Sequence, residues 1–123
     1  MDINKINILV LAYIGDAVYE KIIREHLIKS GINKVNILQK EAVKYVGAKG
    51  QAQILEILIS KNYFTEEELS VIKRARNNKS GTHPKNVDII TYKYATGLEA
   101  LIGYLYFKAD FKRLEEIMKE IVK

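Results

Sequence analysis

The sequence predicts an all-α fold, a single-domain helical bundle, on three observations. The chain has 123 residues, which is the size of one domain. Apolar residues make up 48% and charged residues 28% of it, an ordinary composition for a soluble globular protein. With 7 glycines and 1 proline, it lacks the regular turn signals that separate strands in sandwiches and barrels. We therefore expect residues 1–123 to form one helical domain.

Six helices are expected, because apolar residues recur three and four positions apart in six segments. The segments cover residues 6–27, 35–46, 52–61, 65–76, 89–107 and 111–122. The first helix is expected to be largely buried and to end before Ser30 and Gly31, since glycine favours the left-handed conformation that terminates helices. A bend at residues 47–50 separates the second helix from the third.

The last three helices carry recognisable N-terminal signals. Thr65 and Glu68 have the spacing of a capping box, in which each side chain satisfies the other residue's free backbone amide. Asp88 and Asp110 are placed to cap the fifth and sixth helices. Between the fourth and fifth helices, residues 77–86 form a polar loop without one apolar side chain.

Positive charge is concentrated in one segment of the chain. The net charge is +5, and residues 73–93 hold six Lys or Arg side chains against one Asp. Such a block suggests a polyanionic partner, most often nucleic acid, because lysine and arginine neutralise phosphates and release counterions. The alternative, a solvated basic helix face, stays open from charge alone.

Two features that the sequence lacks, cysteines and long apolar segments, narrow the class of protein. There are 0 cysteines, which excludes disulfides, thiolate metal sites and a cysteine nucleophile. No apolar stretch reaches the roughly 20 residues that a membrane span needs, and the N-terminus does not have the pattern of a signal peptide. We therefore expect a cytoplasmic protein that does not associate with membranes.

Two apolar helices each contain one isolated acid, Asp16 in the first and Glu99 in the fifth. A buried, unpaired carboxylate is costly, so such acids are normally paired, protonated or bound to a metal ion. Two of them on helices that pack together suggest a shared site for Mg²⁺ or Mn²⁺, which prefer oxygen ligands. An ion there can activate water for phosphodiester hydrolysis. The alternative is that each acid pairs with a Lys or Arg or faces solvent.

Glycines flank both acids. Gly15 precedes Asp16, and Gly97 and Gly103 lie on either side of Glu99, although glycine inside a helix costs about 1 kcal/mol relative to alanine. Either close helix–helix approach or room for a substrate backbone would explain them.

The same motifs resemble those of a known family. Residues 13–19, Tyr-Ile-Gly-Asp-Ala-Val-Tyr, resemble the ribonuclease III signature, and residues 95–103 are similar to the family's second acidic motif, ending in Glu-Ala-Leu-Ile-Gly. Segments within residues 76–86 resemble the loop of mini-ribonuclease III, a short subgroup. Residues 48–53 and 91–94 extend the likeness over nearly the whole chain.

The resemblance implies a homodimer with the ribonuclease III catalytic-domain fold that cleaves double-stranded RNA with Mg²⁺, or alternatively Mn²⁺. Asp16 and Glu99 carry over as catalytic metal ligands. The implied substrate is precursor large-subunit (23S) ribosomal RNA, with a ribosomal protein as a candidate partner. Because no separate RNA-binding domain is expected after residue 123, the basic segment is expected to bind RNA. The residues expected to do so are Arg74, Arg76, Asn77, Lys79, Ser80, Thr82, Lys85 and Asn86.

The sequence also departs from full-length ribonuclease III. Ala12 and Thr96 stand where that enzyme has a glutamate and an aspartate, so fewer carboxylates are available to hold metal ions. This thinning is a feature of the mini subgroup, but it also supports an alternative, a non-catalytic double-stranded-RNA-binding or ribosome-associated module that retains the fold. A third alternative is a helical interaction protein with incidental acids. Glu20 is expected to pair with Arg24 rather than to bind metal.

Overall fold

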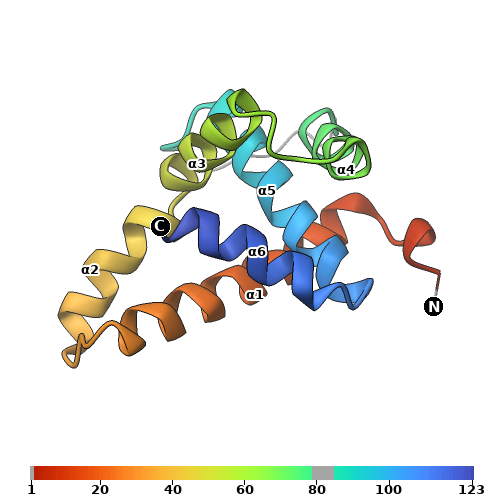
Figure 1. The fold of residues 1–123 in the computed structure, drawn as a ribbon. Helices are drawn as coiled ribbons and strands as arrows, with labels where there is room; N and C mark the ends of the chain where they lie inside the picture. The colour runs from red at the N-terminus through yellow and green to blue at the C-terminus, as the bar shows by residue number, and fades with distance from the viewer. Residues whose placement is uncertain (1, 79–84) are drawn as a thin grey trace.

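Six α-helices and one short 3-10 helix make up the computed structural model, which describes residues 2–78 and 85–123 (Figure 1). They are η1 (Ile3–Lys5), α1 (Ile8–Lys29), α2 (Val35–Val46), α3 (Ala48–Ser60), α4 (Glu66–Arg76), α5 (Ile89–Phe107) and α6 (Phe111–Ile121). Within the described ranges there is no strand. The predicted all-α class is confirmed.

Two helix boundaries differ from the sequence prediction. The first helix begins at Ile8 rather than at residue 6, because the Asn7 side chain accepts a hydrogen bond from the Leu9 amide (2.8 Å) and caps it. The third begins at Ala48 rather than near residue 52, since Gly47 alone, with φ −68° and ψ 153°, makes the bend. Gly50 therefore lies inside α3.

The predicted N-terminal caps are present. Thr65 Oγ1 accepts from the Glu68 amide (3.1 Å), and Glu68 Oε1 accepts from the Thr65 amide (3.0 Å), which completes the capping box. Asp88 Oδ1 accepts a hydrogen bond from the Thr91 backbone amide (2.9 Å), and Asp110 Oδ1 accepts one from the Arg113 backbone amide (3.2 Å). The starts of α4, α5 and α6 thus follow from local sequence.

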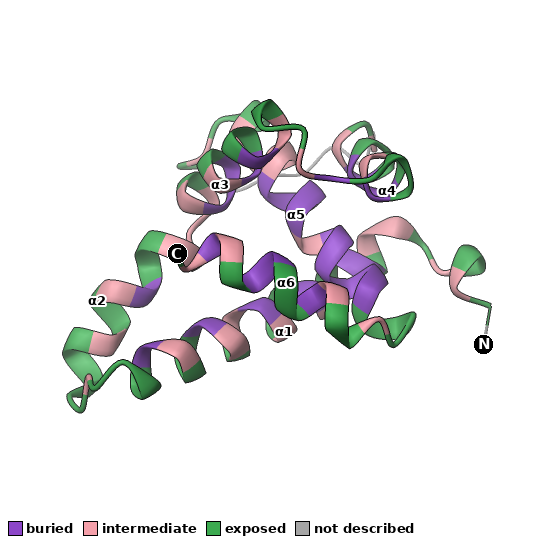
Figure 2. Ribbon diagram, in the orientation of Figure 1, coloured by how far each residue is buried: buried purple, intermediate pink, exposed green. Residues whose placement is uncertain are grey.

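Helix α5 is the centre of the domain, in contact with α1, α3, α4 and α6. From Ala95 to Leu105 every residue is buried except Glu99 (Figure 2). This matches the pattern of a helix that is apolar nearly all round. Glu99 is the only charged residue on this stretch of α5, so it is a candidate for a functional role.

Helix α1 is less buried than the sequence predicted. Its buried side is a single stripe that includes Leu11, Tyr19 and Ile23, while Val10 and Tyr13 are 52% and 82% exposed. The prediction of a largely buried helix was wrong because its packing partners α2, α4 and α5 cover only that stripe. Apolar residues outside that stripe therefore did not mean burial there.

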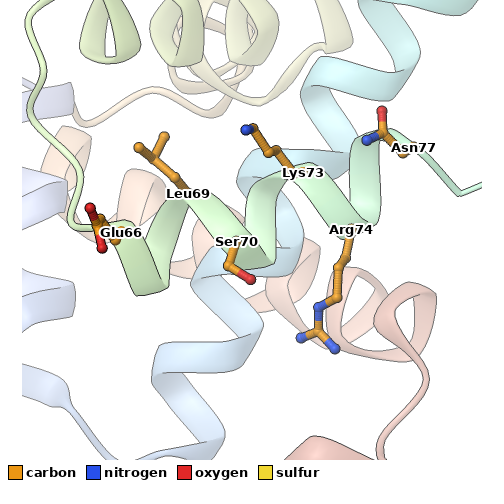
Figure 3. Close-up of a pocket in the computed structure, with 6 residues that line it drawn as sticks. All are labelled: Glu66, Leu69, Ser70, Lys73, Arg74 and Asn77. Atoms are coloured by element: carbon orange, nitrogen blue, oxygen red, sulfur yellow. The ribbon is translucent and has the colours of Figure 1, made fainter.

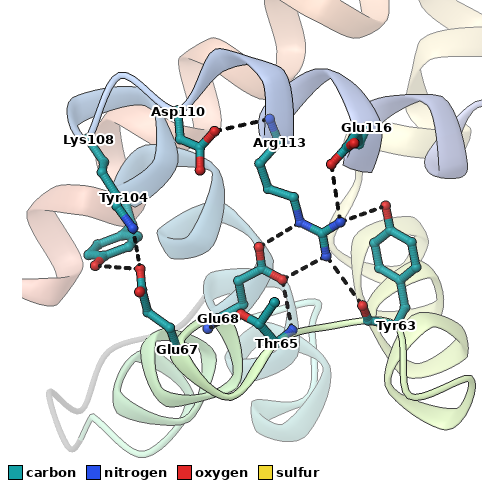
Figure 4. Close-up of polar contacts among 9 residues, drawn as sticks. All are labelled: Tyr63, Thr65, Glu67, Glu68, Tyr104, Lys108, Asp110, Arg113 and Glu116. Carbon is teal, nitrogen blue, oxygen red and sulfur yellow. Dashed lines mark hydrogen bonds and ion pairs between the residues drawn. The ribbon is translucent and has the colours of Figure 1, made fainter.

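An ion pair joins α6 to the start of α4 (Figure 4). Arg113 donates to both carboxylate oxygens of Glu68 (2.7 and 2.8 Å) and to the Tyr63 carbonyl (3.3 Å), and its guanidinium lies 4.7 Å from the Tyr63 ring centroid. Burial acts to raise the pKa of Glu68, but hydrogen bonds from Arg113 and Thr65 outweigh it and hold the pKa below its ordinary value. This pair fixes α6 against the bundle.

No described helix combines the length and the apolar character that crossing a membrane requires.

Candidate active site

Helices α1 and α5 cross with their backbones in direct contact. A Cβ atom on Gly15 would lie 1.7 Å from the Glu99 carbonyl oxygen, and one on Gly103 would lie 1.9 Å from the Leu11 carbonyl oxygen. No side chain fits at either position. Of the two explanations for these glycines, close helix–helix approach is therefore the correct one.

Gly97 has a different neighbour. A Cβ there would lie 3.2 Å from Ile72 Cγ2 on α4 and 3.5 Å from Leu55 Cδ2 on α3. Gly97 therefore serves the packing of α5 against the opposite side of the bundle and leaves no open space for a substrate.

The crossing brings the two isolated acids together. Asp16 follows Gly15, and Glu99 is the residue whose carbonyl Gly15 meets, which places the two acids beside each other at the crossing, close enough for the Asp16 carboxyl to raise the pKa of Glu99. Neither acid has an ion pair with a Lys or Arg among the described residues. Asp16 is exposed and Glu99 is half-buried. The pair therefore forms a small acidic site with Glu99 at its base and Asp16 at its solvent side.

Burial raises the pKa of Glu99 to about 8, helped by the hydrogen bond to Asp16 and by the negative charge of Asp16. A hydrogen bond from Gln51 acts in the opposite direction. Without a cation, Glu99 thus keeps its proton more readily than an ordinary glutamate does. A divalent cation would replace that proton, since metal ligands must be deprotonated.

Gln51 is part of the site, although the sequence analysis gave it no role. It lies on α3, is 1% exposed, and its Nε2 donates to Glu99 Oε2 (3.3 Å) and to the Val46 carbonyl (2.9 Å). Its position carried a signal, because Gln51 lies in the buried stripe that Leu55 and Leu58 continue. A polar residue in an apolar stripe often marks a specific hydrogen-bonding task.

The donor set fits a hard divalent cation held by few protein ligands. The carboxylates of Asp16 and Glu99 are oxygen donors of the kind that Mg²⁺ and Mn²⁺ prefer. Within residues 2–78 and 85–123 no group of three or more His, Cys, Asp or Glu gathers around a common point. Ala12 and Thr96 add no ligand, since both are buried and Thr96 Oγ1 donates to the Tyr92 carbonyl (2.8 Å). Mg²⁺ suits such a site because it retains several waters.

Part of the predicted RNA-binding segment lies at the C-terminal end of α4. Lys73, Arg74 and Asn77 line a depression of about 510 Å³, with Lys73 and Arg74 extending to opposite sides of the helix (Figure 3). Arg76 lies 5.1 Å from the centroid of the Tyr94 ring on α5, a cation–π contact. Neither Asp16 nor Glu99 lines this depression, so the structure does not bring these basic residues into contact with the acidic site.

Two of the remaining predicted RNA-binding residues, Lys85 and Asn86, come shortly before the start of α5. Lys85 and Asn86 are exposed. Lys79, Ser80 and Thr82 lie outside the described residues. Glu20, as expected, pairs with Arg24 (2.8 Å) and so is not a third ligand in this arrangement.

Comparison with known proteins gives a consistent result. Residues 9–110 match the family profile described as "Ribonuclease III domain". The Mini-ribonuclease 3 of Brevibacillus brevis is 50% identical over 119 residues, covering 97% of this chain and 87% of that protein. That of Streptococcus pneumoniae is 45% identical over 118 residues, covering 96% and 92%. A crystal structure of a protein from Fusobacterium nucleatum superposes with a TM-score of 0.86 at 33% identity and covers 99% of this chain and 98% of that one.

Proposed function

The chain belongs to the ribonuclease III family and is an endoribonuclease of that type, and from this premise we propose that it cleaves double-stranded RNA in a Mg²⁺-dependent reaction at Asp16 and Glu99. The observation that carries the proposal is the contact of these two carboxyl groups at the α1–α5 crossing. Mn²⁺ is expected to substitute, because it accepts the same oxygen ligands.

Each acid has its own task in this proposal. When bound, a divalent cation supplies Lewis acidity and lowers the pKa of water for phosphodiester hydrolysis. Glu99 holds the cation from the protein side, where burial and Gln51 restrict its rotamers. Asp16, which is exposed, holds it at the face that RNA approaches. Because the protein offers so few ligands, phosphate oxygens of the RNA are expected to complete the coordination.

RNA binding is assigned to the basic residues beside α4 and α5. The side chains of Arg74, Arg76 and Lys85 supply positive charge for phosphates, and Asn77 and Asn86 supply polar groups for phosphates or 2′-hydroxyls of an A-form duplex. Lys79, Ser80 and Thr82 belong to the same proposed set by sequence. Such contacts select duplex shape rather than base sequence.

The biological setting is proposed from the likeness to mini-ribonuclease III. The substrate would be precursor large-subunit ribosomal RNA in the cytoplasm, presented with or without a ribosomal protein. A homodimer is supported by exposed apolar side chains along α1 and α2, which are Val10, Tyr13, Ile28, Val35 and Val43. Light scattering tests the homodimer, since it gives a particle mass near twice the 14.1 kDa of the chain if the proposal is correct.

A cleavage assay tests the central proposal. Labelled duplex RNA is incubated with the protein in Mg²⁺ or in EDTA, beside the single-stranded form of the same RNA. Duplex cleavage in Mg²⁺ alone is expected. Asp16→Asn should abolish it, whereas Glu20→Gln, a matched change one helical turn away, should leave it intact. Binding without cleavage by the wild-type protein would instead support the non-catalytic module.

A further inference from the structure

The buried amide of Gln51 has more hydrogen-bonding capacity than the surrounding protein uses. Its Nε2 spans two acceptors, the Val46 carbonyl at the end of α2 and Glu99 Oε2 on α5. Its Oε1 is, among the described residues, the buried side-chain oxygen or nitrogen atom that has no hydrogen-bond partner. An unsatisfied buried acceptor costs about 1–3 kcal/mol, so its retention calls for an explanation.

Rotating the amide does not relieve this. A flip would point Oε1 at two acceptors, the Val46 carbonyl and Glu99 Oε2, and would break both hydrogen bonds that Nε2 makes. The observed orientation is therefore the one that the neighbouring oxygens impose. The free acceptor is a consequence of placing an amide, rather than an apolar side chain, beside Glu99.

A purely structural role accounts for only part of the geometry. The bond to the Val46 carbonyl satisfies a free acceptor at the C-terminus of α2, as helix ends require. That role needs one donor and no neighbour at Glu99. A side chain that served packing alone would be apolar, as Leu55 and Leu58 are in the same stripe, and would leave no acceptor unsatisfied.

We propose that Gln51 is a positioning residue of the metal site: its Nε2 holds the Glu99 carboxylate in the orientation that binds the divalent cation. The inference rests on the proposed function, because it assumes that Asp16 and Glu99 bind the cation. The unsatisfied Oε1 is then the cost of placing a hydrogen-bond donor beside Glu99. Residues that orient metal ligands in this way typically contribute about 10–100-fold to metal affinity or activity.

The test compares two glutamines of α3. Gln51→Met keeps the side-chain length but removes donor and acceptor, and Gln53→Met makes the same change at an exposed position of the same helix. Mn²⁺ affinity is measured without RNA from the paramagnetic resonance signal of the free ion. Duplex RNA affinity is measured in EDTA, and the Mg²⁺ concentration for half-maximal cleavage is measured separately.

Gln51→Met should weaken Mn²⁺ binding and raise the half-maximal Mg²⁺ concentration by about tenfold or more. Its duplex affinity in EDTA should stay within twofold of wild type, which a general structural defect would not achieve. Gln53→Met should resemble wild type in all three measurements. Unchanged Mn²⁺ affinity in a folded Gln51→Met protein would overturn the inference.

A second variant keeps the proposal testable if Gln51→Met folds poorly. Gln51→Glu retains size and adds a third carboxylate, so its melting temperature in EDTA should fall and Mn²⁺ should raise it by more than it raises that of wild type. An equal or smaller rise would count against the inference. If wild type itself neither binds Mn²⁺ nor cleaves, the proposed function fails and this inference with it. If wild type does both and the Gln51 variants match it, only this inference fails.

Discussion

Replacing Gly15 by alanine tests the backbone contact on which the site depends. The added Cβ would lie 1.7 Å from the Glu99 carbonyl oxygen and 2.7 Å from its carbon. Ordinary contact begins near 3.4 Å, so α1 and α5 would have to separate by an amount close to the missing distance. The obstacle is main chain on both sides, and no rotamer change can relieve it.

The expected loss follows from two opposing effects. Alanine gains about 1 kcal/mol over glycine in helix propensity. Overpacking typically costs about 1–3 kcal/mol and sometimes more, and a clash between two backbones belongs at the upper end. We expect a net destabilisation of about 2 kcal/mol or more, with loss of cleavage because Asp16 moves away from Glu99.

Urea unfolding followed by circular dichroism measures this loss, and Gly97→Ala is the matched control. At Gly97 the nearest atom is a side-chain methyl carbon of Ile72 at 3.2 Å, which can adjust, so the control should stay within about 1 kcal/mol of wild type. A Gly15→Ala protein as stable and as active as wild type would refute the close crossing of α1 and α5.

Three further predictions concern charge. Arg113→Met leaves Glu68, whose side chain is 5% exposed, without its ion-pair partner and should lower the free energy of unfolding by about 3–5 kcal/mol at pH 7. Because Glu68 has a lowered pKa in the fold, this loss of stability should be smaller in urea titrations at pH 4. A loss that does not change with pH would contradict this. The pKa of Glu99 is raised to about 8 from an ordinary 4.5, so the metal-free fold loses stability as the pH rises from 5 to 8. Glu99→Gln should flatten the dependence of the melting temperature on pH across this range in EDTA, and parallel curves for the two proteins would argue against the raised pKa of Glu99. Replacing Arg74 and Lys85 by glutamine should weaken duplex binding for all sequences and reduce the slope of log affinity against log salt by roughly 1 for each phosphate that is no longer neutralised, whereas an unchanged slope would remove both residues from the interface.

Local signals made most of the fold predictable. The Thr65 capping box and the Asp88 cap gave the starts of α4 and α5, because caps act within four residues of sequence. The limits of α3 were missed since one extended residue, Gly47, makes the turn that four residues were expected to make. The exposure of Tyr13 was missed for a different reason. Periodicity reports which residues are apolar, but the number of packing partners around α1 is a property of the tertiary fold.

The two acids of the candidate site were predictable from the sequence, but its amide side chain, Gln51, was not. Asp16 and Glu99 stand out because a charge in an apolar helix demands a partner. Gln51 is uncharged and sits beside a segment expected to be a bend, so its burial became visible only once α3 packed on α5. The resemblance to ribonuclease III covered residues 48–53 without assigning a task to any of them.

The α1–α5 crossing explains how a site with so few ligands keeps its geometry. The positions of Asp16 and Glu99 are set by contact between Gly15 and the Glu99 backbone, and that contact does not depend on attraction between the acids. Burial raises the pKa of Glu99, and the negative charge of Asp16 raises it further, because two ionised acids at this distance repel each other. The fold therefore keeps the two acids side by side even where their charges would repel each other. If the proposed site binds a divalent cation, that cation offsets the repulsion, and we therefore expect Mg²⁺ or Mn²⁺ to raise the folding stability of this domain.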